Sequence, residues 1–256
     1  MPLKNLIGNI GMINIFRSIG CIGDSLSSGE FEYDNNGEKG FWDCYEYSWG
    51  KQIERVTGIE MTNFSRGGLT AYQLYKEADE KTSPINDINR LFDKDNAKQA
   101  YIIALGVNDI KGKDNLKNLY GGKIGNAKTD IDLTNYTNNA NTFVGAYAKI
   151  IQRLQTITPD AKFFLVTMPT DNGSEEFNLA IDGIANKLDN CYVIDLFHHA
   201  PPYDEDFRSK YFCGHMNAMG YLLTAQYIMT YIDWIIRNNA EDFRYVQFIG
   251  SPYKPI

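Results

Sequence analysis

A serine in a short glycine-containing turn is the clearest candidate for chemistry in this sequence. The run Ile22-Gly23-Asp24-Ser25-Leu26 closes an apolar stretch. A serine hydroxyl is a weak nucleophile unless a tight turn fixes it and a base activates it, and the glycine lets the chain turn sharply where a strand gives way to a helix. The same residues also suit a helix N-cap, because Asp and Ser both favour that position. Ser25 is therefore a candidate nucleophile whose base must lie elsewhere.

Three later segments combine glycine with polar residues that could complete such a site. They follow in this chain order: Asn63-Phe64-Ser65-Arg66-Gly67-Gly68-Leu69-Thr70, then Gly106-Val107-Asn108-Asp109, then Gly214-His215-Met216-Asn217-Ala218-Met219-Gly220-Tyr221. With the first motif they resemble the four sequence blocks of the SGNH (GDSL-type) hydrolases, over residues 19–225. Four blocks in the same order are far more specific than any one of them.

This resemblance implies a role for one residue in each block. Ser25 is the nucleophile, and its backbone N–H is one donor to the oxyanion. Gly68 supplies a second backbone N–H and Asn108 a side-chain N–H, each worth roughly 3–4 kcal/mol when aimed at the charge that develops on a tetrahedral intermediate. His215 takes the serine proton and returns it to the leaving alcohol.

Two further points follow from the same resemblance. Gly67 is an alternative to Gly68, because the double glycine leaves the register open by one residue. Asp24 and Asp109 match positions that anchor the two turns and do not react. No metal or organic cofactor is implied.

The sequence departs from this family at the partner of the histidine. The family places an Asp three residues before it, where this chain has Phe212. An acceptor is still needed, since a wrong tautomer costs about four orders of magnitude in the serine protease example. We favour a Ser–His dyad in which a backbone carbonyl, that of Phe212 or a neighbour, accepts from the ring. A carboxylate of Asp204, Glu205 or Asp206 is the alternative, and a catalytically dead protein is a third reading that the intact Ser, Gly, Asn and His oppose.

The elements that would position these residues are strands alternating with helices. Continuous apolar runs predict buried parallel strands over residues 16–22, 101–105, 163–167 and 192–196, with a weaker one over 58–63. Helical spacing of apolar residues predicts helices over 143–154 and 221–236. Such alternation indicates a three-layer α/β/α sandwich with a parallel sheet of about five strands, in which function lies at the carboxyl ends of the strands. We expect one domain over residues 1–256, with the motif-bearing core at about 16–237.

Two polar segments do not fit this alternation. Residues 28–40 are acidic and rich in Gly and Asn, and they lead into an aromatic cluster over 41–49. Residues 111–138 are longer than the ~12–15 residues usual for a loop without structure. Their glycines, at 121, 122 and 125, lack the ending of a phosphate-binding loop, so we expect a simple loop there.

Bulk properties exclude several classes of protein. A net charge of −7 argues against nucleic acid as a partner. Four scattered cysteines without a C-x-x-C pair give neither zinc spacing nor a disulfide framework, and His198 and His199 lack further ligands at metal spacing. No run approaches the ~20 apolar residues of a transmembrane helix, and the N-terminal stretch does not resemble a signal peptide. We therefore expect a cytoplasmic protein; its oligomeric state is not encoded in any motif.

The function expected from the sequence is hydrolysis of a small acyl ester through an acyl-Ser25 intermediate. An acetylated carbohydrate is the favoured substrate, because the aromatic residues over 41–49 could stack on a sugar ring. A lipase or lysophospholipase activity, an acyltransferase activity and a non-catalytic binding module on the same scaffold remain as alternatives.

Overall fold

A five-stranded parallel sheet forms the centre of the structure. The computed structural model describes residues 11–112, 114–169, 175–199, 205–244 and 246. The strands lie in the spatial order β4 (Glu60–Ser65), β1 (Ser18–Gly23), β5 (Ala100–Ala104), β6 (Lys162–Val166) and β7 (Cys191–Ile194). All four pairings are parallel. Each strand lies where an apolar run predicted it, the weak one included.

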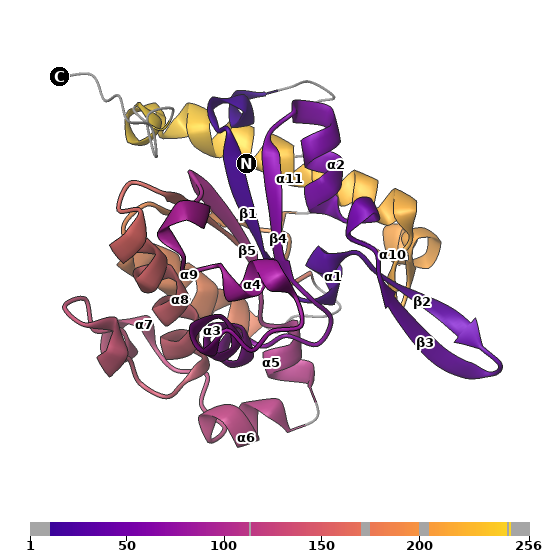
Figure 1. The fold of residues 1–256 in the computed structure, drawn as a ribbon, viewed down its shortest axis with the longest axis horizontal. Coiled ribbons are helices and arrows are strands. Elements are labelled where there is room, and N and C mark those ends of the chain that lie inside the picture. The colour runs from indigo at the N-terminus through magenta and orange to yellow at the C-terminus, as the bar shows by residue number, and fades with distance from the viewer. Residues whose placement is uncertain (1–10, 113, 170–174, 200–204, 245, 247–256) are drawn as a thin grey trace.

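Helices cover both faces of this sheet, which explains why its strands are apolar on both sides. One face packs against α2 (Trp49–Thr57), α11 (Ala218–Asn238) and the 3-10 helices η1 (Met12–Ile15) and η6 (Ala240–Phe243). The other face packs against α3 (Ala71–Glu80), α4 (Asn86–Asn89), α7 (Ala127–Asp130), α8 (Phe143–Ile157) and α9 (Glu175–Lys187). The expected three-layer α/β/α fold is confirmed, as are the helices predicted from spacing, α8 and α11 (Figure 1).

Shorter elements connect these layers. They are α1 (Ser25–Ser28), α5 (Val107–Lys111), α6 (Asn115–Tyr120), α10 (Glu205–Tyr211), η2 (Tyr45–Tyr47), η3 (Lys94–Asn96) and η4 (Tyr136–Asn138). The polar segment 111–138 thus contains α6, α7 and η4. Its glycines at 121, 122 and 125 adopt positive φ and join these short elements. None of the helices within the described residues is both long and apolar enough to cross a bilayer.

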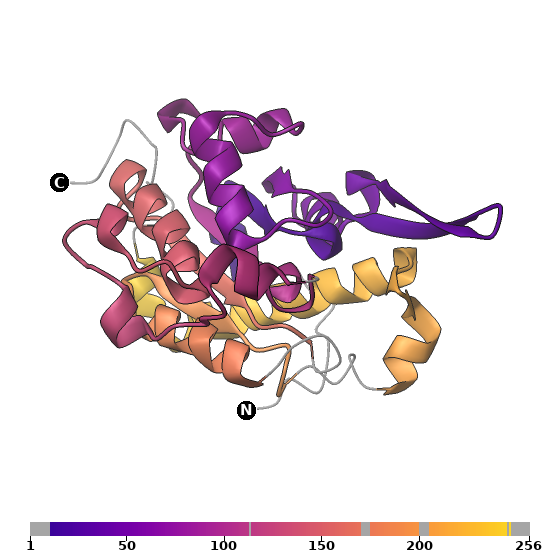
Figure 2. The same ribbon diagram turned by 90° about the horizontal axis from the view of Figure 1, so that it is seen from below.

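The acidic segment that follows α1, which did not fit the predicted alternation of strands and helices, is a β-hairpin. Strands β2 (Glu30–Asn35) and β3 (Glu38–Asp43) pair in antiparallel register around Asn36 and Gly37, whose φ values are 57° and 88°. Positive φ at both central residues is the geometry that a two-residue Asn-Gly turn favours. The hairpin extends away from the sheet in both views (Figures 1 and 2). Its base lies beside the carboxyl end of β1, where α1 begins.

A second small hairpin precedes the last helix. Its strands are β8 (Phe212–Cys213) and β9 (His215–Met216), and β9 packs against α1, β2 and α11. The motif that ends the resemblance is thereby brought next to the motif that begins it.

Candidate active site

The turn that carries Ser25 is shaped by its neighbours on both sides. Strand β1 ends at Gly23, and a Cβ there would lie 2.1 Å from Ser27 Oγ, so the close approach requires glycine. Asp24 is the N-cap of α1, and its Oδ1 accepts the N–H of Leu26 at 3.1 Å. Ser25 is the first residue of the helix, where backbone N–H groups point outwards and favour negative charge. The expected anchoring role of Asp24 and the N-cap interpretation thus describe the same arrangement.

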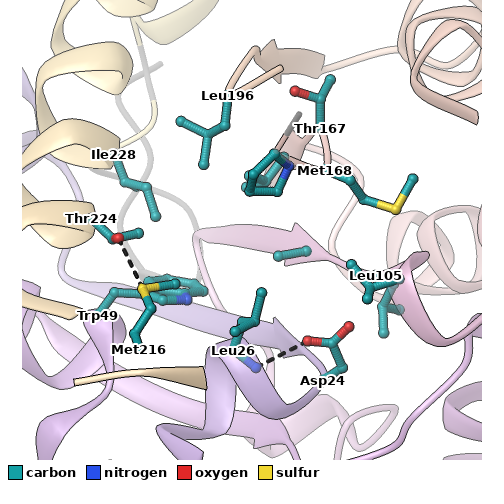
Figure 3. Close-up of a pocket in the computed structure, with 14 residues that line it drawn as sticks. Asp24, Leu26, Trp49, Leu105, Thr167, Met168, Leu196, Met216, Thr224 and Ile228 are labelled. Atoms are coloured by element: carbon teal, nitrogen blue, oxygen red, sulfur yellow. Dashed lines mark hydrogen bonds between the residues drawn. The ribbon is translucent and has the colours of Figure 1, made fainter. Parts of the chain in front are cut away.

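The carboxyl group of Asp24 is buried beside an apolar pocket (Figure 3). Its side chain is 2% exposed, and among the described residues its Oδ2 has no hydrogen-bond partner. The pocket lies between the carboxyl ends of the central strands and α11, and is lined mainly by the apolar residues Leu26, Trp49, Leu105, Val107, Val166, Met168, Leu196, Met216 and Ile228. Burial raises the pKa of Asp24 to about 7. The hydrogen bond from the N–H of Leu26 lowers this pKa, and the charge of Asp109 raises it further.

Asp24→Asn is expected to raise the free energy of unfolding relative to wild type by more at alkaline pH than at acidic pH. In the unfolded chain the carboxyl ionises near its ordinary pKa of 3.8, whereas in the folded protein it ionises near 7. The folded state therefore holds the extra proton, and stability falls as pH rises through that window, by up to about 4 kcal/mol at ~1.4 kcal/mol per unit of pKa. Asn keeps the cap and cannot ionise.

Urea unfolding at pH 5 and pH 8 measures this effect. The free energy of unfolding of Asp24→Asn relative to wild type should be more favourable at pH 8 than at pH 5. Asp95→Asn, at an exposed position, is the matched control and should show no such difference. A pH-independent effect of Asp24→Asn would contradict the assignment of a buried, titrating carboxyl.

The second motif forms the turn between β4 and α3. The N–H of Gly67 donates to Asp43 Oδ2 at 3.3 Å, which engages it with the hairpin. Gly68 adopts φ 76°, is exposed, and within the described residues its N–H has no hydrogen-bond partner. Of the two glycines that the sequence left open, Gly68 is therefore the one with a donor available to a ligand.

The third motif lies against the second. Nδ2 of Asn108 donates to the carbonyl of Leu69 at 3.1 Å, so the amide is fixed next to Gly68. An amide nitrogen has two hydrogens, and one therefore remains for a ligand. Asp109 beside it is buried, accepts the N–H of Ala71 at 3.1 Å, and thereby ties the two motifs together as expected of an anchor.

A tyrosine that the sequence did not single out completes this anchor. The hydroxyl of Tyr120, at the end of α6, donates to Asp109 and accepts the N–H of Tyr72 at 3.1 Å. Burial raises the pKa of Asp109 to about 6, against the lowering effect of these hydrogen bonds. No motif surrounds Tyr120, so nothing in the sequence marks it.

His215 lies between two carboxylates of the hairpin. Its Nδ1 is 2.9 Å from Glu32 Oε1, and its Nε2 is 3.0 Å from Glu30 Oε1. The ring is held edge-on to Phe41 at a centroid distance of 5.8 Å. Burial alone lowers the pKa of His215, but the hydrogen bonds to Glu30 and Glu32 outweigh it, and the net direction is upward.

The partner of Nδ1 differs from every partner that the sequence suggested. The group at Nδ1 is the carboxylate of Glu32. It is neither the carbonyl of Phe212 nor a carboxylate near residue 205. Asp206 instead accepts from Lys210 on its own helix, and Glu205 is exposed. Asp204 lies outside the described residues. The dyad expected from the sequence is therefore corrected: a carboxylate does face the ring, and it comes from the hairpin.

Local packing explains why Glu32 reaches this position. A Cβ on Gly214 would lie 2.0 Å from Glu32 Oε1, so glycine before His215 makes room for the carboxylate. Lys39, across the hairpin, pairs with the other oxygen at 2.9 Å. Burial raises the pKa of Glu32, but hydrogen bonds from Lys39 and His215 prevail and lower it, so this carboxylate stays ionised beside the ring.

The remaining histidines have structural partners. Asp195 follows β7 and accepts the N–H groups of Phe197 at 3.0 Å and His198 at 2.9 Å, and its other oxygen lies 3.1 Å from Nδ1 of His198. His199 is 4.0 Å from the same carboxylate. A search of the described residues finds no group of three or more His, Cys, Asp or Glu side chains placed to hold a metal ion.

Comparison with known proteins identifies the family of this chain. The sequence profile of the GDSL-like Lipase/Acylhydrolase family matches residues 21–223, which include all four motifs. None of the curated proteins matches the sequence significantly.

Solved structures share the fold at low sequence identity. A family two carbohydrate esterase from Cellvibrio japonicus is 17% identical with a TM-score of 0.57, over 86% of this chain and 62% of that one. A family two carbohydrate esterase from Clostridium thermocellum, in complex with cellohexaose, is 16% identical with a TM-score of 0.54, over 88% of this chain and 65% of that one. The psychrotrophic esterase EstA from Pseudoalteromonas sp. is 16% identical with a TM-score of 0.53, over 87% of this chain and all of that one. On the extent of the profile match, the chain belongs to the GDSL-like lipase/acylhydrolase family.

Proposed function

We propose that this protein is a serine esterase with Ser25 as nucleophile, His215 as general base and Glu32 as the carboxylate that orients the imidazole. The observation that carries the proposal is the contact of 2.9 Å between Nδ1 of His215 and Glu32. A carboxylate on Nδ1 leaves Nε2 as the nitrogen that exchanges a proton with serine, which is the arrangement of a Ser–His–acid triad. This contact supports the catalytic function over a non-catalytic binding module, because the binding module was suggested by the missing acid.

The reaction would proceed in two steps, acylation of Ser25 and hydrolysis of the acyl-serine. Ser25 Oγ attacks the ester carbonyl carbon while Nε2 of His215 takes its proton, and the imidazolium then gives that proton to the departing alcohol. Water adds to the acyl-serine, again losing a proton to His215, and the acid leaves as Ser25 recovers its proton. The negative charge on the tetrahedral intermediates would be met by the N–H groups of Ser25 and Gly68 and by the amide of Asn108.

An acetylated carbohydrate is the substrate class that these surroundings support best. Exposed aromatic side chains gather on and beside the hairpin that carries Glu32: Tyr33, Phe41, Trp42 and Tyr47. Phe41 touches the ring of His215 directly. Aromatic faces stack on apolar faces of ligands, and two structural neighbours are described as carbohydrate esterases. An alcohol leaving from His215 would emerge beside Phe41.

A fluorophosphonate probe tests the proposed nucleophile directly. We expect stoichiometric modification of wild-type protein, located at Ser25 by peptide mass spectrometry, because only an activated serine attacks phosphorus rapidly. His215→Ala should slow the labelling by several orders of magnitude. Labelling elsewhere, or none under conditions that label a known esterase, would contradict the proposal.

Chain-length preference tests the substrate class separately. p-Nitrophenyl acetate should be hydrolysed with a higher kcat/KM than p-nitrophenyl decanoate, and acetylated xylo- or cello-oligosaccharides should release acetate. A strong preference for the decanoate would instead favour a lipase-type activity on the same site.

A further inference from the structure

Glu30 places a second carboxylate on the histidine, at the nitrogen that catalysis needs. Its Oε1 lies 3.0 Å from Nε2 of His215, and its other oxygen lies against Gly67, 2.2 Å from the point where a Cβ would be. The side chain is only 13% exposed. Glu30 is therefore wedged between the imidazole and the turn that carries the candidate oxyanion donor Gly68.

The backbone around Glu30 holds it in that place. Glu30 follows Gly29, which ends α1 at φ 79°. The carbonyl oxygen of Glu30 accepts a hydrogen bond from the hydroxyl of Tyr221 in α11 at 2.7 Å. Its cross-strand partner is Asp43, which accepts the N–H of Gly67 and the hydroxyl of Ser28. The hairpin, the nucleophile helix and the last helix all contribute to the position of this one carboxylate.

A nitrogen that donates to Glu30 cannot accept a proton from Ser25. Both ring nitrogens of His215 face carboxylates, and both can donate only when the ring is an imidazolium. A general base must be neutral at the start of the reaction. We propose that Glu30 is a positioning residue that holds His215 in this protonated resting form, and that release of the Nε2 proton to solvent frees this nitrogen from Glu30 to act as the base for Ser25.

The other charged groups around His215 define what Glu30 adds. Glu32 lies on Nδ1 and is itself neutralised in part by Lys39. Asp24, at the N-cap of α1, interacts with the charge of His215, and Asp43 of β3 flanks Glu30. The hydroxyl of Tyr221 is engaged with the backbone of Glu30. Of these groups, Glu30 is the one in contact with Nε2, so its removal should favour the neutral ring while Glu32 keeps it oriented.

Histidine NMR titration of Glu30→Gln tests this proposal without requiring activity. The three histidines are assigned by comparison with single His→Ala variants. We expect the midpoint of His215 to fall by about one pH unit in Glu30→Gln, while His198 and His199 are unchanged. Glu38→Gln, at an exposed position of the same hairpin, is the matched control and should leave all three midpoints in place.

The pH–rate profile supplies the second readout and rests on the proposed role of His215 as base. In Glu30→Gln, the acidic limb of kcat/KM for p-nitrophenyl acetate should move to lower pH by the same amount, giving a several-fold gain near pH 6. The alkaline plateau of each protein serves as the reference from which the position of its acidic limb is measured. Glu30→Asp keeps the charge but has a shorter side chain, so it should shift the acidic limb by part of that amount. It also provides a second variant in case Glu30→Gln does not fold.

Failure of this proposal is distinguishable from failure of the proposed function. An unchanged His215 midpoint in a folded Glu30→Gln protein would overturn the role of Glu30, whatever the activity. A uniform loss of rate with an unmoved acidic limb would also overturn it, because that is the signature of a purely structural residue. If wild type is inert yet the midpoint falls, the esterase proposal fails and the contact between Glu30 and His215 stands.

Discussion

Alanine at position 25 is expected to lower kcat for p-nitrophenyl acetate by about 10⁴- to 10⁶-fold, because loss of the nucleophile in a serine hydrolase removes the covalent route. The Ser25→Ala protein should still fold, because Ser25 is the first residue of α1 and the N-cap of that helix is Asp24. Circular dichroism and a thermal melt check that it folds, and steady-state kinetics measure the loss.

Ser27→Ala is the matched control for this substitution. Ser27 lies in the same turn, is fully buried, and among the described residues its hydroxyl has no hydrogen-bond partner. Removing that hydroxyl should therefore change the rate by less than a few fold. If Ser25→Ala retained activity comparable with Ser27→Ala, the nucleophile would have to be sought elsewhere.

Glu32→Gln is expected to lower kcat by roughly 10²- to 10⁴-fold, the upper end being the loss seen for the corresponding change in the serine protease example. The side chain of Glu32 is 13% exposed and contacts Nδ1 of His215 at 2.9 Å. The amide of Gln can present its N–H₂ to the ring, which reverses the tautomer and leaves the negative charge of Glu32 absent when the imidazolium forms. The reduced rate should hold across the whole pH profile.

The candidates that the sequence had suggested serve as controls for Glu32. Asp206→Asn and Glu205→Gln should each cost less than tenfold, because Asp206 pairs with Lys210 and Glu205 is exposed. Phe212→Leu should keep most of the activity. A loss of several orders of magnitude in Asp206→Asn, with Glu32→Gln nearly unaffected, would reinstate the loop carboxylate and reject the hairpin one.

These experiments separate the two hairpin carboxylates by what each changes. Glu32 should control the height of the pH–rate profile, because it orients the ring in every step, and since it also raises the pKa of His215 its removal should move the acidic limb as well. Glu30 should control the position of the acidic limb, because it competes for Nε2 only while that nitrogen is protonated. Glu30 and Glu32 are two positions apart in β2, so their side chains lie on the same face of the strand. They would thus act on opposite sides of one imidazole.

Much of the fold was determined by the sequence on its own. Four of the five strands are short apolar runs, which is typical of a parallel sheet covered on both faces, and their alternation with helical segments favours that setting. Strand ends in a parallel sheet point the same way, so the motifs after β1, β4 and β5 had to meet at one edge. Ser25 was suggested by its own turn, whereas Asn108 and the double glycine were suggested by the resemblance to the SGNH hydrolases, and their roles stay predictions.

The hairpin was within reach of the sequence, but residues 28–40 were described only as a polar segment outside the alternation of strands and helices. Asn36-Gly37 stands between two six-residue segments, and that dipeptide favours a two-residue turn with positive φ. The charged residues along both strands concealed the pattern, because the hairpin projects into solvent and buries little apolar surface. An Asn-Gly turn signal therefore deserved more weight than hydropathy here.

Only the tertiary structure decided which groups face His215. Glu32 and His215 are 183 residues apart, and no local pattern relates a strand of an exposed hairpin to a two-residue strand before the last helix. Likewise, the contact of Gly67 with Asp43 distinguishes it from Gly68. For Asp109, already expected to be an anchor, the tertiary structure adds its partners Ala71 and Tyr120. The sequence determines apolar periodicity and turn chemistry, which act over a few residues. Pairing between distant polar side chains depends on how the finished layers pack, and the contact of Glu32 with His215 is such a pairing.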